Sequence, residues 1–219
     1  MKKKTAKAAP DLSHERIRSA ALELIDKDGL EEFSTRKLGR LLDCEAMAIY
    51  WYYPSKDALL DAVVDKLMLG VGARLAETKT DDWIGTMRGL AHAYRQVAHD
   101  HPKAFPLLAT RRFASEGTFD FLDRLFTLSR EQGIDDKVTA RFYRVISSYC
   151  SGFALSELAG PRGPQDPRTA PLRKKYPRVA AVSEWLDSKR LDEIFEFGLE
   201  VQLAALDNAV RSAHKGHTR

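Results

Sequence analysis

Four successive aromatic residues followed closely by a lysine form the stretch whose side chains are best suited to contact a polyanion. Residues 50–53 read Tyr-Trp-Tyr-Tyr, and Ser55 and Lys56 follow after a proline. Successive helical residues point in different directions, so these four rings cannot all be buried in one small core. We expect Trp51 to pack inside and at least one tyrosine hydroxyl to reach a phosphate. Ser55 can cap a helix whose first turn holds Lys56, where backbone amides and the helix dipole favour phosphate.

Helices must position these side chains, and the spacing of apolar residues predicts a series of them in this part of the chain. Their expected ranges are 13–29, 34–43, 45–52 and from Ser55 onward, with Ser13, Ser34 and Ser55 as N-caps and Gly29 as a left-handed stop. The inner face of the first helix should hold Ile17, Ala20, Ala21, Leu24 and Ile25. The inner face of the last should hold Leu59, Leu60, Val63 and Leu67.

The second and third of these helices are short and are joined at Asp43–Cys44, which matches a helix-turn-helix in size and order. A short helix is poorly stable alone, so an apolar cluster must hold the pair against the first helix. We expect this cluster to contain Leu38, Leu41, Leu42, Cys44 and Ile49. The opposite face is then free to enter a major groove, and it carries Ala46, Met47, Ala48, Tyr50 and Tyr52.

The positive charge of the chain comes from one end rather than from its body. The 219 residues include 35 Lys or Arg and 31 Asp or Glu, for a formal net charge of +4, yet residues 11–56 hold seven basic and nine acidic residues. Residues 1–12 are therefore expected to be a flexible basic tail that adds salt-sensitive, unspecific affinity for DNA. Specific binding must depend on where Arg36, Lys37 and Lys56 lie.

Beyond Thr78 the pattern remains helical without strand-like alternation, so we predict an all-α protein. Further helices are expected near 83–99, 103–114, 118–132, 136–159 and 192–212. Residues 13–56 should form the helix-turn-helix domain and residues 57–213 a larger helical domain. Gly160 to Arg178 contains five prolines and six basic residues, and it is expected to be a mobile loop, with a separate nucleic-acid contact left open.

The sequence also argues against several other classes of protein. The apolar stretches of a signal peptide or a membrane span are missing, which predicts a soluble cytoplasmic protein without a membrane partner. Cys44 and Cys150 are expected to be reduced, packed thiols. No catalytic motif is recognisable, so we expect neither an enzyme nor a cofactor. The cluster His99-Asp100-His101 is interpreted as a solvated helix end, and no metal site is expected.

The stretch ERIRSAALELIDKDGLEEFSTRKLGRLLDCEAMAIYWYYPSKDALLDAVVD, residues 15–65, resembles the DNA-binding domain of the TetR family of transcriptional regulators. Its most specific part is the run IYWYYPSKDALLD. Further along, HPKAFPLLATRRF and EFGLEVQLAALDNAV resemble the tetracycline-repressor-like branch. The resemblance implies a homodimer that binds double-stranded operator DNA through one recognition helix per subunit. It also implies a repressor that is released by a small-molecule effector bound in the larger domain.

The resemblance also assigns roles to individual positions. Ser34, Thr35 and Arg36 match residues of the family's second helix that touch phosphates and one base. Tyr50, Tyr52 and Lys56 match phosphate or groove contacts. The predicted DNA-contacting set is completed by Lys37, Ala46, Met47 and Ala48. Ala46 and Ala48 replace polar residues of the tetracycline repressors and can contact only a thymine methyl, so the tetracycline operator is not the expected target.

Effector and dimer contacts are expected in the larger domain. Leu107 and Gly72 stand where the tetracycline repressors carry histidines, so an apolar or aromatic effector is expected rather than a tetracycline–metal complex. The predicted pocket residues are Met87, Tyr94, Phe105, Leu108, Thr110, Phe113, Phe142, Ile146, Tyr149 and Phe153. The predicted dimer-interface residues are Tyr143, Ser147, Cys150, Ala154, Leu158, Ile194, Phe195, Gly198 and Val201.

Two other functions remain as alternatives. One is a helical small-molecule-binding protein or enzyme that keeps the helix-turn-helix only as a scaffold. The other is an architectural DNA binder that uses its lysine tail without selecting a sequence. Selective retention of one promoter fragment over competitor DNA would separate the regulator from both.

Overall fold

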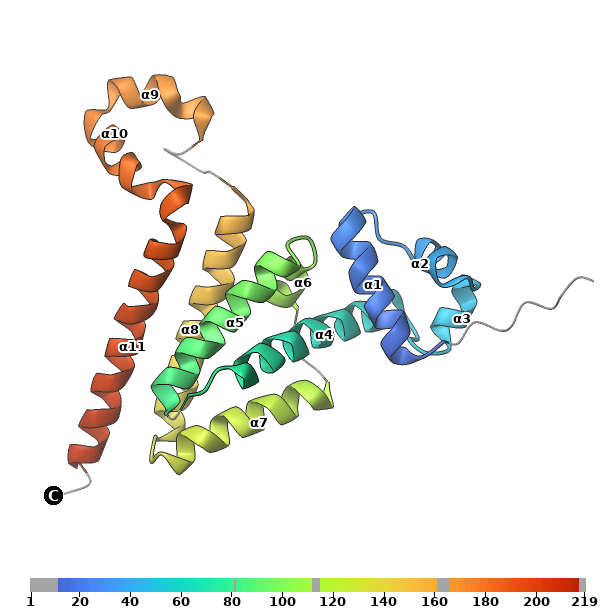
Figure 1. Cartoon of the computed structure of the whole chain (residues 1–219), viewed down its shortest axis with the longest axis horizontal. Helices are drawn as coiled ribbons and strands as arrows, with labels where there is room; N and C mark the ends of the chain where they lie inside the picture. Colours follow the sequence, from blue (N-terminus) through green and yellow to red (C-terminus); the bar gives the residue numbers. More distant parts are fainter. Residues whose placement is uncertain (1–11, 81, 112–114, 161–165, 217–219) are drawn as a thin grey trace, which may run out of the picture. The chain divides into compact units, whose positions relative to one another are not determined.

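The computed structural model describes residues 12–80, 82–111, 115–160 and 166–216. Every regular element in these stretches is a helix, as the sequence predicts (Figure 1). The chain divides into two compact units, the first comprising residues up to Leu69 together with His101–Thr118, and the second Gly70–Asp100 together with residues from Phe119 onward. The basic tail predicted at residues 1–12 lies almost entirely outside the described residues. Among the described helices, none combines the length and the apolar character that a membrane span needs.

The first unit begins with helix α1 (His14–Asp28), which is capped at both ends as predicted. The Ser13 hydroxyl oxygen accepts a hydrogen bond from the backbone N–H of Arg16 at 3.2 Å. Gly29 has φ 91°, a conformation that favours glycine, and its N–H bonds to the Ile25 carbonyl. Ile17, Ala21 and Ile25 are fully buried on the inner face. Local sequence signals therefore define this helix.

Helices α2 (Thr35–Leu42) and α3 (Ala46–Tyr50) form the predicted helix-turn-helix. Ser34 caps α2, and Asp43 ends it in the left-handed conformation, with φ 56° and ψ 41°. The two helices approach each other at Gly39, where a Cβ atom would lie only 2.7 Å from the Cys44 carbonyl oxygen. Glu45 precedes α3 without a side-chain cap. The position of α3 therefore depends on tertiary packing more than on its own end signals.

The predicted burial of two residues in this unit is wrong. Leu41 is 54% exposed and Trp51 is 88% exposed. Leu38 and Leu42 do share the inner face of α2, but the third inner position belongs to Gly39, because the backbone of α3 passes there. Ile49 near the end of α3 and Tyr53 just beyond it occupy the inner positions, so Trp51 between them points outward.

Helix α4 (Lys56–Glu77) starts in the first unit and continues into the second. Ser55 caps it by accepting from the N–H of Ala58 at 3.0 Å. Its buried Leu59, Leu60 and Val63 pack within the first unit, so this unit extends beyond the predicted limit at residue 56. The short helix α6 (Phe105–Thr110) also belongs here.

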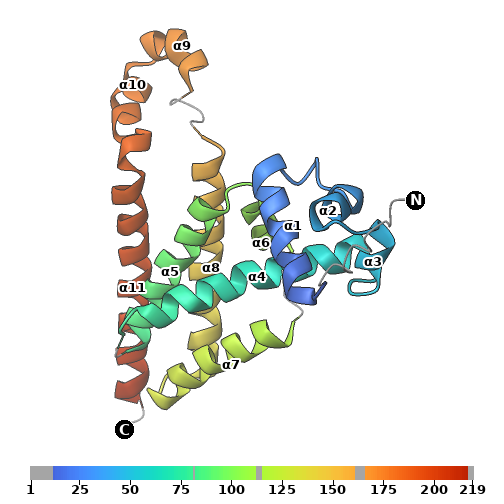
Figure 2. The same cartoon turned by 45° about the vertical axis from the view of Figure 1, so that its right-hand side comes forward.

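In the second unit, α5 (Trp83–Asp100), α8 (Asp136–Leu158) and α11 (Leu191–Gly216) pack against one another, and α7 (Glu116–Glu131) enters it from Phe119 (Figure 2). Met87, Ile146 and Leu199 are almost fully buried in its core. The Tyr149 hydroxyl donates to the Phe195 carbonyl at 2.9 Å and lies against Gly198, where any Cβ would clash with it. These contacts fix α8 against α11.

The segment predicted as a mobile loop, 160–178, is largely helical where it is described. It contains a 3-10 turn at Pro167–Thr169, helix α9 (Ala170–Lys175) and the start of α10 (Pro177–Ser183). Two further 3-10 turns, Glu184–Leu186 and Ser188–Arg190, lead into α11. Pro167, Pro171 and Pro177 each stand in the first turn of one of these short pieces, where proline is tolerated, and none could lie inside a longer continuous helix.

An acid-sensitive contact joins α1 to α4. Hydrogen bonds from Lys66 and Arg18 lower the pKa of Glu15 to about 2. A carboxyl with a lowered pKa stabilises the fold above its unfolded pKa and loses that contribution as the pH falls through its folded value. Glu15→Gln should therefore remove part of the stability loss between about pH 5 and pH 2. Because the Glu15 side chain is 54% exposed, the effect should be at most about 1 kcal/mol. Urea unfolding at pH 7 and pH 3 measures it, and an unchanged pH dependence would contradict this assignment.

Candidate functional site

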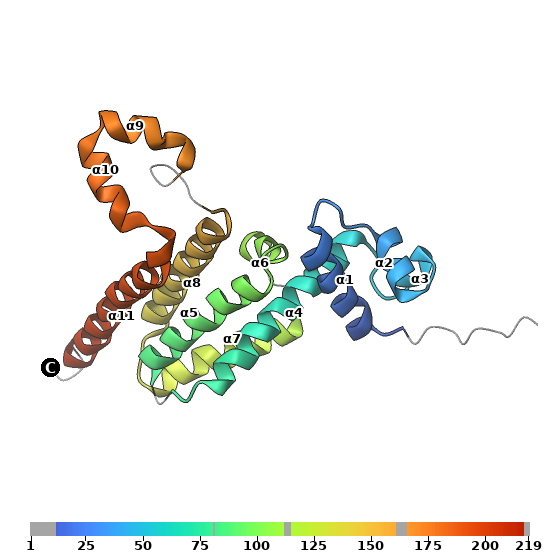
Figure 3. The same ribbon diagram turned by 45° about the horizontal axis from the view of Figure 1, so that its top comes forward.

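The start of α2, the end of α3 and the start of α4 come together in the first unit (Figure 3). Thr35 and Tyr50 share a hydrogen bond between their hydroxyl oxygens at 3.3 Å. The Lys56 ammonium donates to the Phe33 carbonyl at 3.0 Å and lies 5.5 Å from the centroid of the Phe33 ring. The structure thus brings together Thr35, Tyr50 and Lys56, three of the predicted DNA-contacting residues. An ammonium has three N–H donors, so Lys56 keeps donors for a phosphate while it holds the chain that precedes α2.

Tyr52 has a different role from the predicted phosphate contact. Its hydroxyl donates to the Leu12 carbonyl at 2.8 Å, and the neighbouring Tyr53 hydroxyl donates to the His14 carbonyl at 2.9 Å. The His14 ring packs edge-on against both tyrosine rings. A tyrosine has one O–H donor, and here that donor serves the fold. Tyr52 therefore holds the chain after α3 against the chain before α1, and its O–H is not free for the predicted phosphate contact.

Lys37 is also held within the chain. Its ammonium lies 2.9 Å from a carboxylate oxygen of Glu32 and 3.6 Å from one of Asp28, and the Glu32 carboxylate raises the pKa of Lys37. The group of one cation and two anions has a net negative charge, which opposes contact with phosphate. Among the described residues, Arg36 and Arg40 on the exposed face of α2 have no ion-pair partner. Arg40 was missed in the sequence, although it lies four residues after Arg36 and so on the same face.

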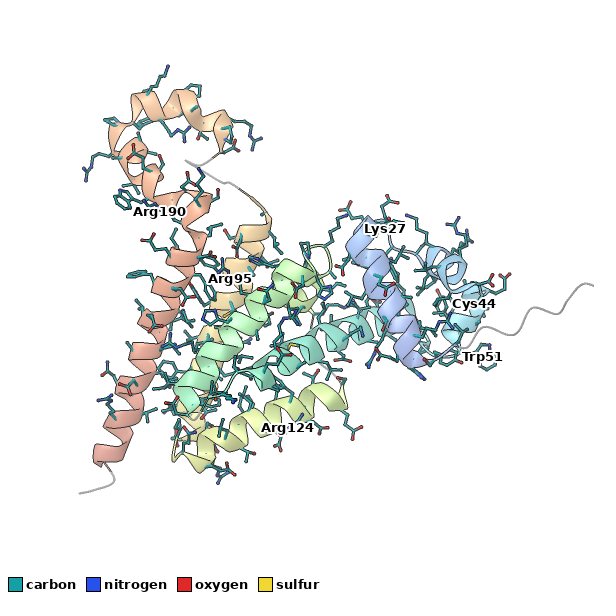
Figure 4. The ribbon with its side chains drawn as sticks, viewed as in Figure 1. Lys27, Cys44, Trp51, Arg95, Arg124 and Arg190 are labelled. Carbon is teal, nitrogen blue, oxygen red and sulfur yellow. The ribbon has the colours of Figure 1, made fainter. Side chains whose placement is uncertain are left out.

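The outward face of α3 is apolar. Met47 is 69% exposed and Trp51, four residues later, is 88% exposed, while Ala46 and Ala48 are partly exposed. Trp51 extends away from the helix-turn-helix into solvent (Figure 4). Because they are one helical turn apart, Met47 and Trp51 form a joint apolar patch, and such patches mark interaction surfaces. The face can contact thymine methyl groups, while Arg36, Arg40 and the Ser34 hydroxyl supply donors for phosphates or base edges.

Several predicted dimer contacts are wrong because the residues are buried inside one chain. Cys150, Ala154 and Phe195 are each at most 1% exposed, and burial raises the pKa of Cys150 to about 12. Gly198 is covered by Tyr149. Among the remaining predicted residues, Val201 is 56% exposed, and those partly exposed are Tyr143, Ser147, Leu158 and Ile194.

A different face of α8 and α11 is exposed. On α8 one exposed stripe with helical spacing carries Val145, Ser148, Gly152 and Ser156, and the exposed Arg141 precedes it by one turn. On α11 one exposed stripe carries Phe197, Val201, Ala204 and Ala205, with the exposed Glu193 and Glu200 beside it. A Cβ atom at Gly152 would meet nothing within 4 Å. Small residues beside large apolar ones permit close helix packing, so these two stripes suit a second copy better than the predicted set does.

The predicted effector residues divide between the two units. Phe105, Leu108 and Thr110 belong to the first unit, while Met87, Tyr94, Phe142, Ile146, Tyr149 and Phe153 belong to the second. Phe113 lies outside the described residues. Met87 and Ile146 are core residues, and Tyr149 and Phe153 pack against Phe195. The two cavities described within the second unit are lined by other residues.

The cluster at His99-Asp100-His101 lies at the end of α5, with His99 and Asp100 exposed as predicted, and each of the three side chains also has a polar partner. The His99 ring lies 3.1 Å from Glu157, Asp100 pairs with Arg74, and the His101 ring lies 2.6 Å from Asp26. In the described part of the chain, no group of three or more His, Cys, Asp or Glu side chains is arranged to hold a metal ion.

A helix-turn-helix with an exposed apolar and arginine-bearing face, joined to a larger helical unit, defines a class of DNA-reading proteins. The model for bacterial regulatory proteins of the tetR family matches residues 17–63. The model for the tetracyclin repressor-like C-terminal domain matches residues 75–210. The chain therefore belongs to the tetR family of bacterial regulatory proteins.

Similar proteins agree with this assignment. An HTH-type transcriptional regulator of Saccharopolyspora erythraea is 35% identical over 154 residues, which cover 70% of this chain but 64% of the relative, less than two thirds of its length. The tetracycline repressor protein class D of Escherichia coli is 26% identical over 205 residues, covering 89% of this chain and 92% of the relative. A solved structure of a possible TetR family transcriptional regulator from Streptomyces coelicolor A3(2) superimposes with a TM-score of 0.77 at 29% identity, covering 90% of this chain and all of the other.

Proposed function

We propose that this protein is a dimeric, sequence-specific transcriptional repressor that acts on operator DNA in the bacterial cytoplasm and is released by a small-molecule effector. The observation that carries the proposal is the outward face of α2 and α3, where Arg36, Arg40, Met47 and Trp51 are exposed on a helix-turn-helix. The family matches, whose named members are regulators and repressors rather than enzymes, support the same conclusion. A largely apolar or aromatic effector is proposed from the aromatic composition of the larger domain.

Release from DNA would proceed through α4, a long helix that begins at the helix-turn-helix in the first unit and continues into the second. Arg111, immediately after α6, donates to Asp61 at 3.0 Å and to Asp57 at 2.7 Å, so α6 is tied to the first turns of α4. An effector that binds better to one arrangement of these helices shifts the population towards it. The two recognition helices of a dimer would then lose the spacing of about one helical turn that successive major grooves require.

The direct test is to footprint the full-length protein on the DNA upstream of its own gene. We expect one protected, pseudo-palindromic site that survives an excess of competitor DNA. Binding without preference for any fragment would contradict the proposal and indicate an architectural DNA binder. No binding at all would indicate that the helix-turn-helix serves only as a scaffold.

Trp51→Ala should weaken operator binding with almost no change in stability. The side chain is 88% exposed, so its removal uncovers little of the core. If its ring contacts bases or sugars in the groove, affinity should fall by roughly 10- to 100-fold, corresponding to about 1–3 kcal/mol. Fluorescence anisotropy of a labelled operator measures this. Leu41→Ala, at an exposed apolar residue of α2, is the matched control, and equal losses for both variants would argue against a specific role for Trp51.

Lys56→Ala should weaken operator binding and flatten its salt dependence. One phosphate contact contributes a slope of about 0.9 in a plot of log affinity against log salt. The same change removes the hydrogen bond to the Phe33 carbonyl, so affinity alone would not separate a phosphate contact from a structural one. The salt slope does. If affinity falls while the slope stays the same, Lys56 acts only by holding the start of α2.

A further inference from the structure

A polar cleft of about 570 Å³ lies within the second unit on the surface of α5. Its lining includes two small buried residues of α5, Gly89 and Ala93. A Cβ atom at Gly89 would come within 2.9 Å of the Thr78 hydroxyl oxygen, so the glycine keeps the end of α4 close to α5. Arg95 of α5 and Asp192 of α11 also line the cleft. The volume is in the range that small-molecule sites occupy.

Arg95 supplies a fixed cation in this cleft (Figure 4). Glu157 of α8 binds one edge of the guanidinium, accepting from Nε at 3.0 Å and from Nη2 at 2.7 Å. The guanidinium carbon lies 4.7 Å from the ring centroid of Phe195 and 5.7 Å from that of Phe153. The Arg95 side chain is only 12% exposed. Its orientation is therefore set before any ligand arrives, which lowers the entropic cost of binding.

The other edge of the guanidinium is held loosely. Asp192 accepts from Nη2 at 2.7 Å, but its side chain is 89% exposed. None of the described residues accepts a hydrogen bond from Nη1. Exposed ion pairs of this kind contribute little stability. The Asp192 carboxylate therefore occupies the edge of the guanidinium at which a ligand carboxylate would form two parallel hydrogen bonds. A ligand can displace Asp192 from this edge.

We propose that this cleft binds a small organic molecule through a single carboxylate, which replaces Asp192 on Arg95. The remaining charges of the cleft define the class of ligand. Arg74 adds a second cation that is already paired with Asp100, whereas Glu77 has no cationic partner among the described residues and repels highly charged anions. The ring nitrogens of His92 and His99 lie 3.6 Å from Glu196 and 3.1 Å from Glu157. A monocarboxylate fits this balance better than a phosphate.

The exchange also has a structural consequence. The pair between Arg95 and Asp192 is one of the links between α5 and the first turn of α11. A ligand that takes over the guanidinium edge releases this link and leaves the pair with Glu157 of α8 intact. Binding is thereby transmitted to α11, the helix that carries exposed Phe197 and Val201.

The test uses the full-length protein labelled with ¹⁵N, titrated with benzoate at constant ionic strength. Benzamide is the matched neutral probe, and inorganic phosphate is the anion without an organic body. We expect benzoate to shift the backbone amide signals of Gly89, Ala93 and Asp192, and neither control to shift them. If benzoate leaves these signals unchanged, or if benzamide or phosphate shifts them equally, the proposal is wrong.

A substitution at Asp192 tests separately whether the ligand displaces this carboxylate. Asp192→Asn removes the competing carboxylate without touching the core, so benzoate should bind about two- to fivefold more tightly, as expected from removal of an exposed ion pair. Asp207→Asn is the control, since Asp207 lies on the same helix and pairs with Arg211 outside the cleft. Its affinity for benzoate should equal that of the unmodified protein. Unchanged or weaker binding in Asp192→Asn would overturn the displacement of Asp192 by the ligand.

Discussion

Replacing Gly39 by alanine should displace the recognition helix and abolish most operator binding. The new Cβ atom would lie 2.7 Å from the Cys44 carbonyl oxygen and 3.3 Å from the Ala46 nitrogen. Both neighbours are backbone atoms, so no side chain can rotate away. Overpacking of this kind costs about 1–3 kcal/mol or more. A displacement that costs about 2–3 kcal/mol to reverse would weaken operator binding roughly 30- to 150-fold.

Gly70→Ala is the matched control for this experiment. Gly70 is also a helical glycine, but its added Cβ would meet only Val97 Cγ2, at an ordinary contact distance of 3.8 Å. Alanine favours a helix over glycine by about 0.5–1 kcal/mol, so this variant should be as stable as the unmodified protein or more so. Thermal unfolding and operator anisotropy on both variants separate the two effects. Normal operator affinity in Gly39→Ala would show that α3 tolerates a shift, and the proposed geometry would be wrong.

The same glycine illustrates what the sequence can and cannot predict. The caps at Ser13 and Ser34 and the junction at Asp43–Cys44 depend on neighbouring residues, and all three are read directly from the sequence. Gly39 looks like an unremarkable helical glycine until the backbone of α3 is placed against it. Leu41 was assigned to the core because helical spacing alone cannot tell which of two adjacent faces a partner helix will cover.

The aromatic cluster at residues 50–53 also shows a limit of prediction from local sequence, here because the deciding contacts are distant along the chain. That the four rings of residues 50–53 must divide between core and surface follows from helical geometry. Which ring goes where depends on Leu12 and His14, whose carbonyls accept from Tyr52 and Tyr53 across about forty residues of chain. Because those partners come from α1 and the chain just before it, the exposure of Trp51 could not be predicted from its own segment.

The prediction of several dimer-interface residues is wrong for a related reason. Periodicity predicts long helices at 136–159 and 192–212 and assigns one apolar face of each to the dimer, but the face containing Cys150, Ala154 and Phe195 packs within the chain. The second stripe, weaker in hydrophobicity and rich in small residues, is the exposed one. A single sequence does not distinguish an intramolecular stripe from an intermolecular one, since both bury apolar side chains.

Phe197→Glu should convert the proposed dimer to a monomer and reduce operator affinity by more than about 100-fold, because the two half-sites are then no longer held by linked subunits. Phe197 is 72% exposed on the free stripe of α11. In a two-fold interface every substitution occurs twice, so two carboxylates would lose water without gaining partners. Phe119→Glu on α7, at a phenylalanine that is 62% exposed, carries the same charge change outside the stripe.

Light scattering should give twice the 24.7 kDa of one chain for the unmodified protein and for Phe119→Glu, and the single-chain mass for Phe197→Glu. A dimer that survives Phe197→Glu would move the interface away from this stripe, whereas a loss of mass in both variants would show that added charge alone, rather than its position, dissociates the protein.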